Sequence, residues 1–590
     1  MNIQEFDILN VLLAEPYETQ RRLAERSGHS LGIVNRSLKA LAQAGYLDGQ
    51  FQPTQQALDL SRKNSPKNAV ILAAGFGMRM VPINTSAPKG LLEIHGEPLI
   101  ERLIRQLQAV GIRDITLVVG FMKEQYEYLM DEFGVSLVVS RDYARKNNLH
   151  SLALAASRLG NTYVVPCDIW CPENPFRQRE LYPWYMVSDA TTPDSGLRVS
   201  RKLELVPAPD TTPGNRMVGI AYLLEKQSQT VRERLLEMCR DPGNDGCFWE
   251  EALYEKGRFL LPPRVVPAEA AVEINTYEQL RELDSHSSQL KNEAIDVIAG
   301  TMGVTTGEIT DISVLKKGMT NRSFRFRCKG REYIMRIPGE GTDQLISRPH
   351  EAAVYAAIRG QGLCSDLDYI NPDNGYKITR FLDNARVCDP ENWADVSRCM
   401  EKLRQFHHLG LQVDHAFDLF GQIEFYESLW NGAPSAYKDH ARTRQQVFSL
   451  RPYIEAHAEK KALTHIDAVP DNFLFVRSGD REDLQLIDWE YAGMQDPHVD
   501  VAMFIIYAMY GRAQADRLID TYFEGACPRE TRIKIYCYIA VCGLLWSDWC
   551  EYKRSLGVEF GEYSLRQYRY AKDYYKLVRE MLEEEPPCTR

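Results

Sequence analysis

The sequence predicts a multi-domain α/β protein built from three unlike parts. Its 590 residues are too many for a single hydrophobic core. Residues 1–66 alternate short helical patterns with polar turns. Residues 67–288 alternate short apolar strands with helices, which is typical of a doubly wound, mostly parallel sheet. Residues 289–590 start with β-rich segments and continue as a long helical region rich in aromatic residues, which indicates an α+β domain.

Composition and charge limit the classes of function. Hydrophobic residues make up 44% of the chain and charged residues 26%, as in ordinary globular proteins. The net charge of −11 argues against broad binding to nucleic acid or to an anionic membrane surface. We find no signal-like opening segment and no apolar run near the roughly 20 residues that cross a bilayer, so we expect no membrane insertion. The 13 cysteines form no C-x-x-C pair, and we expect reduced thiols in a cytoplasmic protein.

The N-terminal part looks like a winged helix-turn-helix. Residues 19–28 and 31–45 predict two helices joined by a short turn, and the residues after them suggest a wing. Arg36 and Lys39 on the second helix could meet phosphate, but residues 1–66 carry seven basic and seven acidic side chains. DNA binding and an interaction or dimerisation role therefore both stay open, and the chain could form an oligomer. The polar segment Ser61–Asn68 suits a linker.

The second part opens with a strand that runs into a glycine loop. Ala69–Ala74 is a short apolar run that ends in glycines. Further helical and strand patterns follow at Leu99–Val110, Ile115–Val119 and Tyr163–Pro166. Gly75 and Gly77 let the backbone approach phosphate oxygens, and Arg79 and Lys89 add two positive charges. The pattern is neither a Walker A loop nor a Rossmann fingerprint.

This A-A-G-x-G-x-R-M motif, with the P-K pair that follows it, resembles the nucleotidyltransferases that make sugar nucleotides and CDP-alcohols. The resemblance implies that the two basic residues neutralise charge during attack on the α-phosphate of a nucleoside triphosphate. It assigns nucleotide binding to Ala73, Ala74, Gly75 and Gly77. The implied fold is the doubly wound α/β domain that the strand and helix pattern already predicts.

Attack on a phosphate also needs Mg²⁺ held by carboxylates at strand ends. Asp168 follows the apolar strand at residues 163–166, at the edge where open α/β sheets bind ligands. The segment Glu273–Thr276 resembles the family's E-I-D-T segment, which carries a metal ligand. This chain has Asn275 where the family more often has Asp, so the expected metal role there rests on Glu273.

The similarity extends to the bacterial CTP:phosphocholine cytidylyltransferases. The segment Asn147–Ala155 resembles their N-N-x-x-S-L stretch, which implies that Asn148 and Ser151 lie near the nucleotide. Trp249 and Glu250 resemble their aromatic and acidic segment. A quaternary ammonium group cannot donate hydrogen bonds, so aromatic faces and carboxylates hold it best. We therefore expect phosphocholine at Trp249 and Glu250, with specificity for CTP implied by the resemblance alone.

The third part carries the sharpest motif in the chain. His465–Asn472 matches H-x-D-x-x-x-x-N and resembles the catalytic loop of phosphotransferases. In that loop the aspartate, here Asp467, accepts the proton of the substrate hydroxyl, and the asparagine, here Asn472, holds Mg²⁺. Asp488 follows an apolar strand and supplies the second expected Mg²⁺ ligand. The two motifs together predict phosphoryl transfer from ATP.

Upstream and downstream segments resemble choline and aminoglycoside kinases. Leu315–Phe324, which contains Asn321, is similar to their nucleotide-binding hairpin. Arg336 occupies the position of the usual phosphate-binding lysine, as is common in choline kinases, and Glu351 is its expected partner.

The expected choline site is aromatic. Trp546, Trp549 and Tyr552 recur on one helical face and resemble the aromatic residues that box the trimethylammonium group in choline kinases. Trp489 and Glu490 follow the expected metal ligand directly and join this site. Plain core packing is the alternative for such a stripe.

Together the resemblances imply a fused enzyme. It would phosphorylate choline with ATP and then convert phosphocholine and CTP to CDP-choline and pyrophosphate, with Mg²⁺ at both sites. One alternative is a sugar-1-phosphate nucleotidyltransferase fused to a sugar or aminoglycoside kinase, against which the tryptophans argue. The other is a ligand-sensing transcription regulator, against which the intact Asp467, Asn472 and Asp488 argue.

Overall fold

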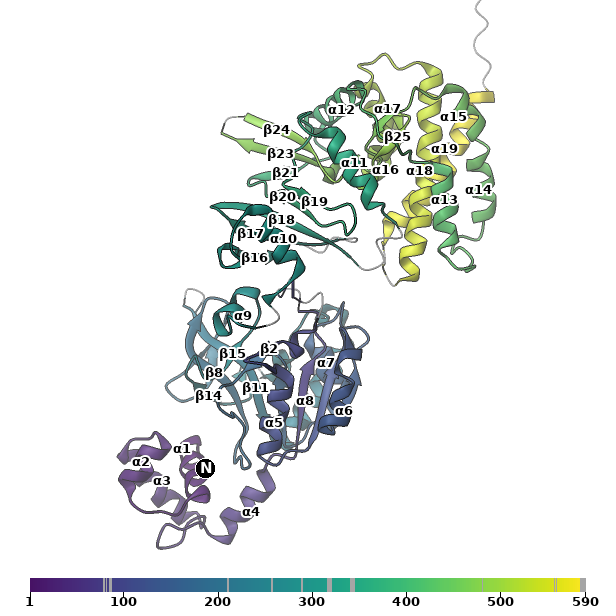
Figure 1. Ribbon diagram of the computed structural model, residues 1–590. Coiled ribbons are helices and arrows are strands. Elements are labelled where there is room, and N and C mark those ends of the chain that lie inside the picture. The colour runs from purple at the N-terminus through teal and green to yellow at the C-terminus, as the bar shows by residue number, and fades with distance from the viewer. Residues whose placement is uncertain are drawn as a thin grey trace, which may run out of the picture. The chain divides into compact units, whose positions relative to one another are not determined.

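The chain forms two compact units (Figure 1). The first comprises Met1–Asp296 and Asp311–Val314, and the second Val297–Thr310 and Leu315–Arg590. The computed structural model describes all residues except 78–79, 81, 84–86, 210–211, 256–257, 288–289, 316–320, 340–344, 480, 557, 559 and 584–590. The division between the units falls at α10 (Glu293–Met302) and β16 (Thr310–Val314).

Four helices form the N-terminal module. They are α1 (Ile3–Ala14), α2 (Gln20–Ser27), α3 (Leu31–Gln43) and α4 (Gln55–Asn64). Thr19 and Ser30 cap α2 and α3, and Gly28 ends α2 in the left-handed region at φ +69°. The expected wing is a single bridge between Leu47 and Pro53. The first half of the expected linker is helical, because α4 continues to Asn64 with Ala57 and Ser61 buried on one face, and its last residue, Asn68, already belongs to the first strand of the sheet.

A seven-stranded mixed sheet forms the centre of the first unit, in the order β14-β8-β11-β6-β1-β4-β5. Its strands are β1 (Asn68–Ala73), β4 (Asp114–Val119), β5 (Ser136–Val139), β6 (Thr162–Pro166), β8 (Trp184–Thr192), β11 (Gly214–Leu223) and β14 (Pro263–Val266). β1 is an interior strand and pairs in parallel with β4 and β6. The helices are α5 (Leu99–Ala109), α6 (Tyr128–Phe133), α7 (Asn148–Leu154), α8 (Glu225–Met238) and α9 (Tyr277–Leu283).

Short two-stranded pairs complete the first unit. They are β2 (Glu93–Ile94) with β3 (Glu97–Pro98), β7 (Ile169–Trp170) with β15 (Val272–Glu273), β9 (Leu197–Val199) with β10 (Leu205–Pro207), and β12 (Tyr254–Glu255) with β13 (Arg258–Phe259). The N-terminal module packs on this unit through α1. Phe6 stacks on Tyr182 with ring centroids 5.5 Å apart, Tyr182 Oη donates to Asp7 at 2.8 Å, and Arg179 donates to the Leu13 carbonyl at 2.6 Å.

The second unit begins with a β-rich part. Its strands are β17 (Asn321–Cys328), β18 (Arg331–Pro338), β19 (Tyr369–Ile370), β20 (Lys377–Arg380), β21 (Ala385–Val387), β22 (Ala462–Thr464), β23 (Phe473–Ser478), β24 (Arg481–Leu486) and β25 (Gly493–Gln495). β17, β18, β20 and β19 are neighbours in that order, and α11 (Arg348–Ile358) follows β18 in the chain.

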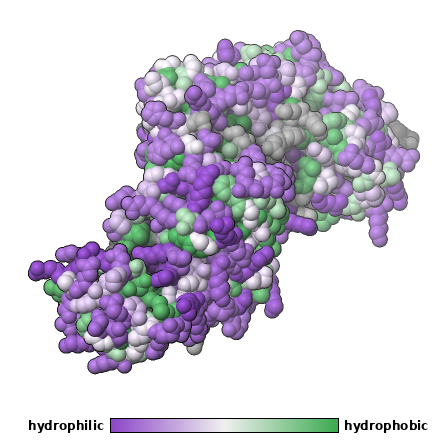
Figure 2. Space-filling view, turned by 60° about the horizontal axis from the view of Figure 1, so that its bottom comes forward, coloured by the Kyte–Doolittle hydropathy of each residue, from purple (hydrophilic) through white to green (hydrophobic). Residues whose placement is uncertain are grey.

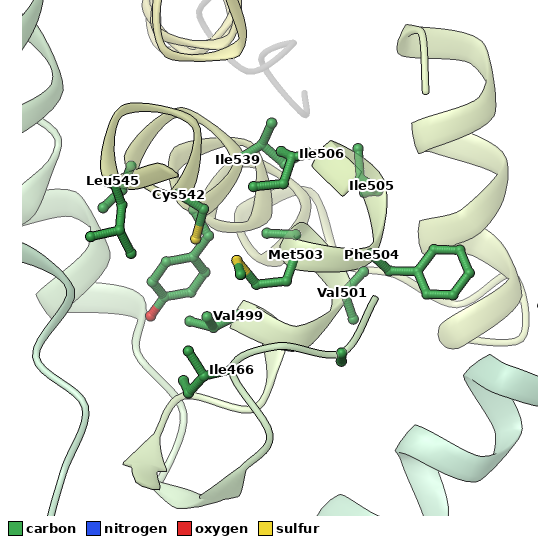
Figure 3. Close-up of a cluster of buried hydrophobic side chains, with 14 of the residues drawn as sticks. Ile466, Val499, Val501, Met503, Phe504, Ile505, Ile506, Ile539, Cys542 and Leu545 are labelled. Atoms are coloured by element: carbon green, nitrogen blue, oxygen red, sulfur yellow. The ribbon is translucent and has the colours of Figure 1, made fainter. Parts of the chain in front are cut away.

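The remaining helices form the larger part of the second unit. They are α12 (Trp393–His408), α13 (Leu419–Ser428), α14 (His440–Phe448), α15 (Arg451–His457), α16 (His498–Tyr507), α17 (Arg512–Tyr522), α18 (Arg529–Ser555) and α19 (Glu562–Glu583). By length and composition α18 could cross a membrane, but its apolar window is completely buried inside the unit. Figure 3 shows why: Ile539, Cys542 and Leu545 of α18 lie against Met503 and Ile506 of α16 in the core.

The face of the molecule in Figure 2 is mostly hydrophilic, with scattered hydrophobic residues. All twelve described cysteines are free thiols.

Candidate active sites

A glycine loop follows β1, an interior strand of the first sheet. Ala73 and Ala74 at the carboxyl end of β1 are buried, whereas Gly75 is exposed. Gly77 has φ +62°, in the left-handed region that only glycine adopts readily. The expected nucleotide loop therefore starts at the carboxyl edge of the sheet, where open α/β sheets bind ligands. Arg79 lies outside the described residues.

Lys89 joins two polar side chains that come from distant parts of the chain. Its Nζ forms an ion pair with Asp168, just beyond β6, and donates a hydrogen bond to Asn275 Oδ1 at 2.7 Å. The pairing of β7 with β15 brings these two residues together, and Ile274 donates its N–H to the Asp168 carbonyl at 3.0 Å. Two oxygen donors thus converge on one cation. Such a donor set fits Mg²⁺ shared with phosphate oxygens.

Glu273, the other expected metal ligand, belongs to a different group. It lies opposite Ile169 in the β7–β15 pair, and its charge contributes to raising the pKa of Tyr185 and of Glu250. Among the described residues, no hydrogen bond or ion pair joins Glu273 to Lys89. The geometry therefore favours Asn275 over Glu273 beside Asp168.

Trp249 is part of the core of the first unit. It is 1% exposed and packs against Tyr185, with ring centroids 6.2 Å apart. Asn148 Oδ1 accepts the backbone N–H of Trp249 at 2.8 Å, and Ser151 is buried in the same helix as Asn148, α7. The structure thus brings Asn148 to the Trp249 segment but places the indole ring in packing, not on an open face for a cation.

Glu250 has a buried carboxylate group that can accept further hydrogen bonds or a cation. Tyr185 Oη donates to Glu250 Oε1 at 2.9 Å, while Oε2 is buried without a hydrogen-bond partner among the described residues. Burial raises the pKa of Glu250 to about 7, and the charges of Glu251 and Glu273 act in the same direction. A bound cation would satisfy this carboxylate and lower its pKa again.

The catalytic-loop residues of the second unit lie together as the motif predicts. Asn472 Nδ2 donates to the Asp467 carbonyl at 2.8 Å and to Asp467 Oδ2 at 3.0 Å. Burial raises the pKa of Asp467 to about 8, and repulsion from Asp488 and Glu490 adds to this effect. Glu490 lies beside the cation Arg336, whereas Asp467 and Asp488 would gain from a bound metal ion. Asn472 and Asp488 therefore fit as ligands of Mg²⁺, which would return Asp467 to its ionised form.

Asp500 of α16 accepts hydrogen bonds from the backbone of the catalytic loop. No sequence motif indicated this residue. Its two carboxylate oxygens accept the backbone N–H groups of His465 at 3.0 Å and Ile466 at 2.7 Å. His407 Nε2 lies 2.9 Å from the same carboxylate. In Figure 3, Ile466 lies beside Val499 from the start of α16, so the loop rests directly on the hydrophobic core.

Arg336 and Glu351 form a two-pronged ion pair. Both distances between the guanidinium and carboxylate groups are 2.6 Å. Glu490 lies 3.4 Å from Arg336, and Lys377 Nζ lies 3.0 Å from Glu351 Oε1. The positive charges of Lys377 and Arg336 lower the pKa of Glu351 to about 2 despite its burial. Sequence reasoning missed Lys377, which lies in a strand with no recognised motif.

Asn321 is the first residue of β17. Residues 316–320 of the expected nucleotide-binding hairpin lie outside the described residues, and so does the side chain of Asn321.

A cavity of about 950 Å³ adjoins both the catalytic loop and Arg336. Its polar lining includes Arg336, Lys377, Asp467, Asn472, Asp488 and Glu490. Its aromatic lining includes Tyr491, Trp546, Trp549, Phe560 and Tyr563. Sequence reasoning identified the two tryptophans but missed the other three, which come from a loop and from the α19 region.

Two expected substrate residues do not line this cavity. Trp489 is fully buried against His465 and Phe406, with ring centroids 4.5 and 5.0 Å away, and donates to the Leu486 carbonyl at 2.9 Å. Tyr552, one turn beyond Trp549 on α18, is absent from the described lining.

Three stretches of the chain match known protein families. Residues 1–48 match the winged helix-turn-helix DNA-binding family, residues 69–179 the MobA-like NTP transferase domain, and residues 311–536 the phosphotransferase enzyme family. The predicted fold class, with its three different modules, is confirmed.

Relatives of two kinds match different stretches. The choline-phosphate cytidylyltransferase of Streptococcus pneumoniae is 44% identical over 109 residues, which cover 18% of this chain and 48% of the relative. Protein LicA of Haemophilus influenzae Rd is 28% identical over 278 residues, 45% of this chain and 100% of the relative. The chain thus spans only about half the length of the first of these.

A third relative is matched over most of its length. The 2-aminoethylphosphonate cytidylyltransferase of Lancefieldella rimae is 30% identical over 233 residues, 37% of this chain and 88% of the relative. The chain therefore belongs to the cytidylyltransferase family with a MobA-like NTP transferase domain, and it joins this domain to one of the phosphotransferase enzyme family.

Proposed function

We propose that the chain makes CDP-choline in two steps, first as a choline kinase and then as a CTP:phosphocholine cytidylyltransferase. The observation that carries the proposal is the second-unit cavity, in which Asp467 shares one space with an aromatic group that includes Trp546 and Trp549. An aromatic wall attracts a quaternary ammonium group and offers few hydrogen bonds to a sugar. One relative is a choline-phosphate cytidylyltransferase by name, which supports the second step.

In the kinase step, choline would bind with its ammonium group on the tryptophans and its hydroxyl at Asp467. The hydroxyl oxygen attacks the γ-phosphorus of ATP, the bond to ADP breaks, and Asp467 takes the proton. Mg²⁺ held by Asn472 and Asp488 would neutralise the phosphates. Asn472 also orients Asp467 through the 3.0 Å hydrogen bond.

In the cytidylyl step, a phosphate oxygen of phosphocholine attacks the α-phosphorus of CTP, and pyrophosphate leaves. Lys89 would stabilise the charge that develops on the α-phosphate. Asp168 and Asn275 would hold Mg²⁺ there. Arg79, adjacent in the chain to the glycine loop, keeps the role that the family resemblance implies. Glu250 would meet the ammonium group.

The direct experiment supplies the purified chain with choline, ATP, CTP and Mg²⁺ and detects products by mass spectrometry. CDP-choline is the expected product. A parallel panel contains ethanolamine for the first step and phosphoethanolamine and 2-aminoethylphosphonate for the second. If none of the amino-alcohols is phosphorylated, the kinase assignment fails; if only 2-aminoethylphosphonate receives the cytidylyl group, the phosphocholine assignment fails.

We also propose that the N-terminal module binds DNA. The contacts of α1 with Tyr182 and Arg179 leave α3 at the surface, where Arg36 and Lys39 are exposed and have no ion pair among the described residues. A helix with exposed cations suits the major groove. Fluorescence anisotropy with a fragmented library of the source genome tests this; loss of all binding at moderate salt, with no enriched sequence, contradicts it.

A further inference from the structure

Two buried cations stand side by side in the kinase-like cavity. Arg336 in β18 and Lys377 in β20 are directly opposite each other in an antiparallel pair, so their side chains emerge on the same face of the sheet. Both contact Oε1 of Glu351, at 2.6 Å and 3.0 Å. Both line the cavity that holds Asp467 and Asp488.

Arg336 already uses most of its hydrogen-bonding capacity inside the protein. Its Nη1 donates to Glu351 and Glu490, and its Nη2 donates to Glu351 and to the Gly375 carbonyl at 3.1 Å. The remaining donor, Nε, is buried and has no hydrogen-bond partner among the described residues, so four of the five N–H groups of Arg336 are in use. A guanidinium group fits a carboxylate in this two-pronged way better than an ammonium does, so Arg336 is suited to fixing Glu351.

Lys377 keeps a donor for a ligand. Its Nζ donates to Glu351 at 3.0 Å and to Tyr355 Oη at 3.1 Å, which leaves one of its three N–H groups beyond these described contacts. The carboxylate of Glu351 holds this compact charge at the cavity wall despite the burial of the site, and the side chain is 8% exposed. An ammonium group in this position can approach a phosphate oxygen without breaking its pair with Glu351.

We propose that Lys377, not Arg336, donates to the ATP phosphates, and that Arg336 is a positioning residue that fixes Glu351. The lysine–glutamate ion pair that is usual in kinases would then also be present in this chain, with its lysine on β20 instead of β18. The proposal rests on the proposed kinase function, but it concerns nucleotide binding alone and can be measured without an acceptor.

The first test compares ATP and adenosine as ligands, both measured by calorimetry in Mg²⁺ buffer. Lys377→Met should weaken ATP binding about 10- to 100-fold, as expected for one lost charge-assisted hydrogen bond, and leave adenosine binding within about twofold. Lys402→Met is the matched control, because Lys402 donates to the Gly362 carbonyl and does not line the cavity. Unchanged ATP binding in Lys377→Met, with loss in Arg336→Met, overturns the proposal.

The second test uses the wild-type chain and so does not depend on the folding of a variant. An ATP derivative acylated on its terminal phosphate transfers its acyl group to an amine near the phosphates. The lysine nitrogen attacks the acyl carbon, the carbon–oxygen bond to phosphate breaks, ATP leaves, and the lost proton goes to solvent. Peptide mass spectrometry should find the acyl group on Lys377, blocked by excess ATP. Labelling that spares Lys377 overturns the assignment.

The two hypotheses fail in different ways. If the chain binds ATP through Lys377 but phosphorylates neither choline nor ethanolamine, the proposed kinase substrate is wrong and the assignment of Lys377 stands. If choline is phosphorylated but Lys377→Met keeps full ATP affinity, only the assignment of Lys377 is wrong.

Discussion

Asp500 holds Ile466 in a backbone conformation that a β-branched residue rarely adopts. Ile466 has φ 70°, and its N–H donates to Asp500 Oδ1 at 2.7 Å. The neighbouring His465 N–H donates to the other oxygen at 3.0 Å. Such strain persists only when surrounding contacts over-determine it. The buried carboxylate therefore sets the direction in which the loop presents Asp467.

Replacing this carboxylate should damage the kinase and spare the cytidylyltransferase. Asp500→Asn loses one acceptor for the loop and the charge that faces His407. We expect a loss of about 2–4 kcal/mol in the free energy of unfolding of the second unit. Choline phosphorylation should fall about 100-fold or more, with conversion of supplied phosphocholine unchanged.

Asp520→Asn is the control for Asp500→Asn, because Asp520 forms an exposed ion pair with Arg532 and should matter little. Chemical denaturation and separate assays of the two steps measure the effects. Full kinase activity in Asp500→Asn would show that the loop does not depend on this carboxylate.

Lys89 should be essential for the second step only. Its ammonium lies between Asp168 and Asn275, where the α-phosphate is expected. Lys89→Met should lower kcat for CDP-choline formation about 100- to 1000-fold, the usual loss when one group that stabilises transition-state charge is removed. Lys123→Met, which removes an exposed lysine paired with Glu124, serves as control. A large rise in KM for CTP with an unchanged kcat would mean that Lys89 only binds the nucleotide.

Local sequence patterns were sufficient for the strands and for the motif residues. The apolar runs became β1, β4 and β6, and Asp467 and Asn472 lie within hydrogen-bonding distance because a short loop joins them. Such features depend on neighbouring residues, which the sequence displays directly.

Residues brought in by tertiary packing could not be predicted in this way. Lys377 reaches Glu351 only because β20 pairs with β18, and Asp500 reaches the loop only because α16 packs beneath it. A residue next to a motif in sequence can also lie outside the site that the motif forms. Trp489 adjoins Asp488 in sequence, yet its ring turns into the core, because burial of a large apolar surface outweighs a role in the cavity.

The cytidylyl step should depend on pH through Glu250. Its pKa is raised from the ordinary 4.5 to about 7, so only the ionised fraction attracts a cationic substrate. Lowering the pH from 8 to 6 should raise KM for phosphocholine about tenfold. Glu250→Gln should flatten this part of the profile, and an unchanged profile would assign the titration to another group.

The same carboxylate should influence stability with a defined sign. Because the folded state binds the Glu250 proton more tightly than the unfolded state, its contribution favours folding below pH 4.5 and is lost as the pH rises towards 7. Glu250→Gln should therefore raise the Tm of the first unit more at pH 8 than at pH 5. Differential scanning calorimetry of both proteins at the two pH values measures the difference.

Substitutions in the aromatic wall of the cavity can distinguish a role in choline binding from a role in core packing. Trp549 lines the cavity and packs edge-on against Trp546, with ring centroids 5.5 Å apart. Trp549→Ala should raise KM for choline about 10- to 100-fold, since a desolvated cation–π contact is worth about 2 kcal/mol or more. KM for ATP should stay within about twofold.

Two matched substitutions serve as controls for Trp549→Ala. Tyr552→Phe, on the same helix but not among the cavity-lining residues, should leave both KM values unchanged. Trp489→Phe should lower Tm with no selective effect on choline, because its ring fills the core. Steady-state kinetics and thermal unfolding of the three variants distinguish these outcomes. If Trp489→Phe raised KM for choline as much as Trp549→Ala while stability held, the choline site would have to lie deeper, beside the catalytic loop.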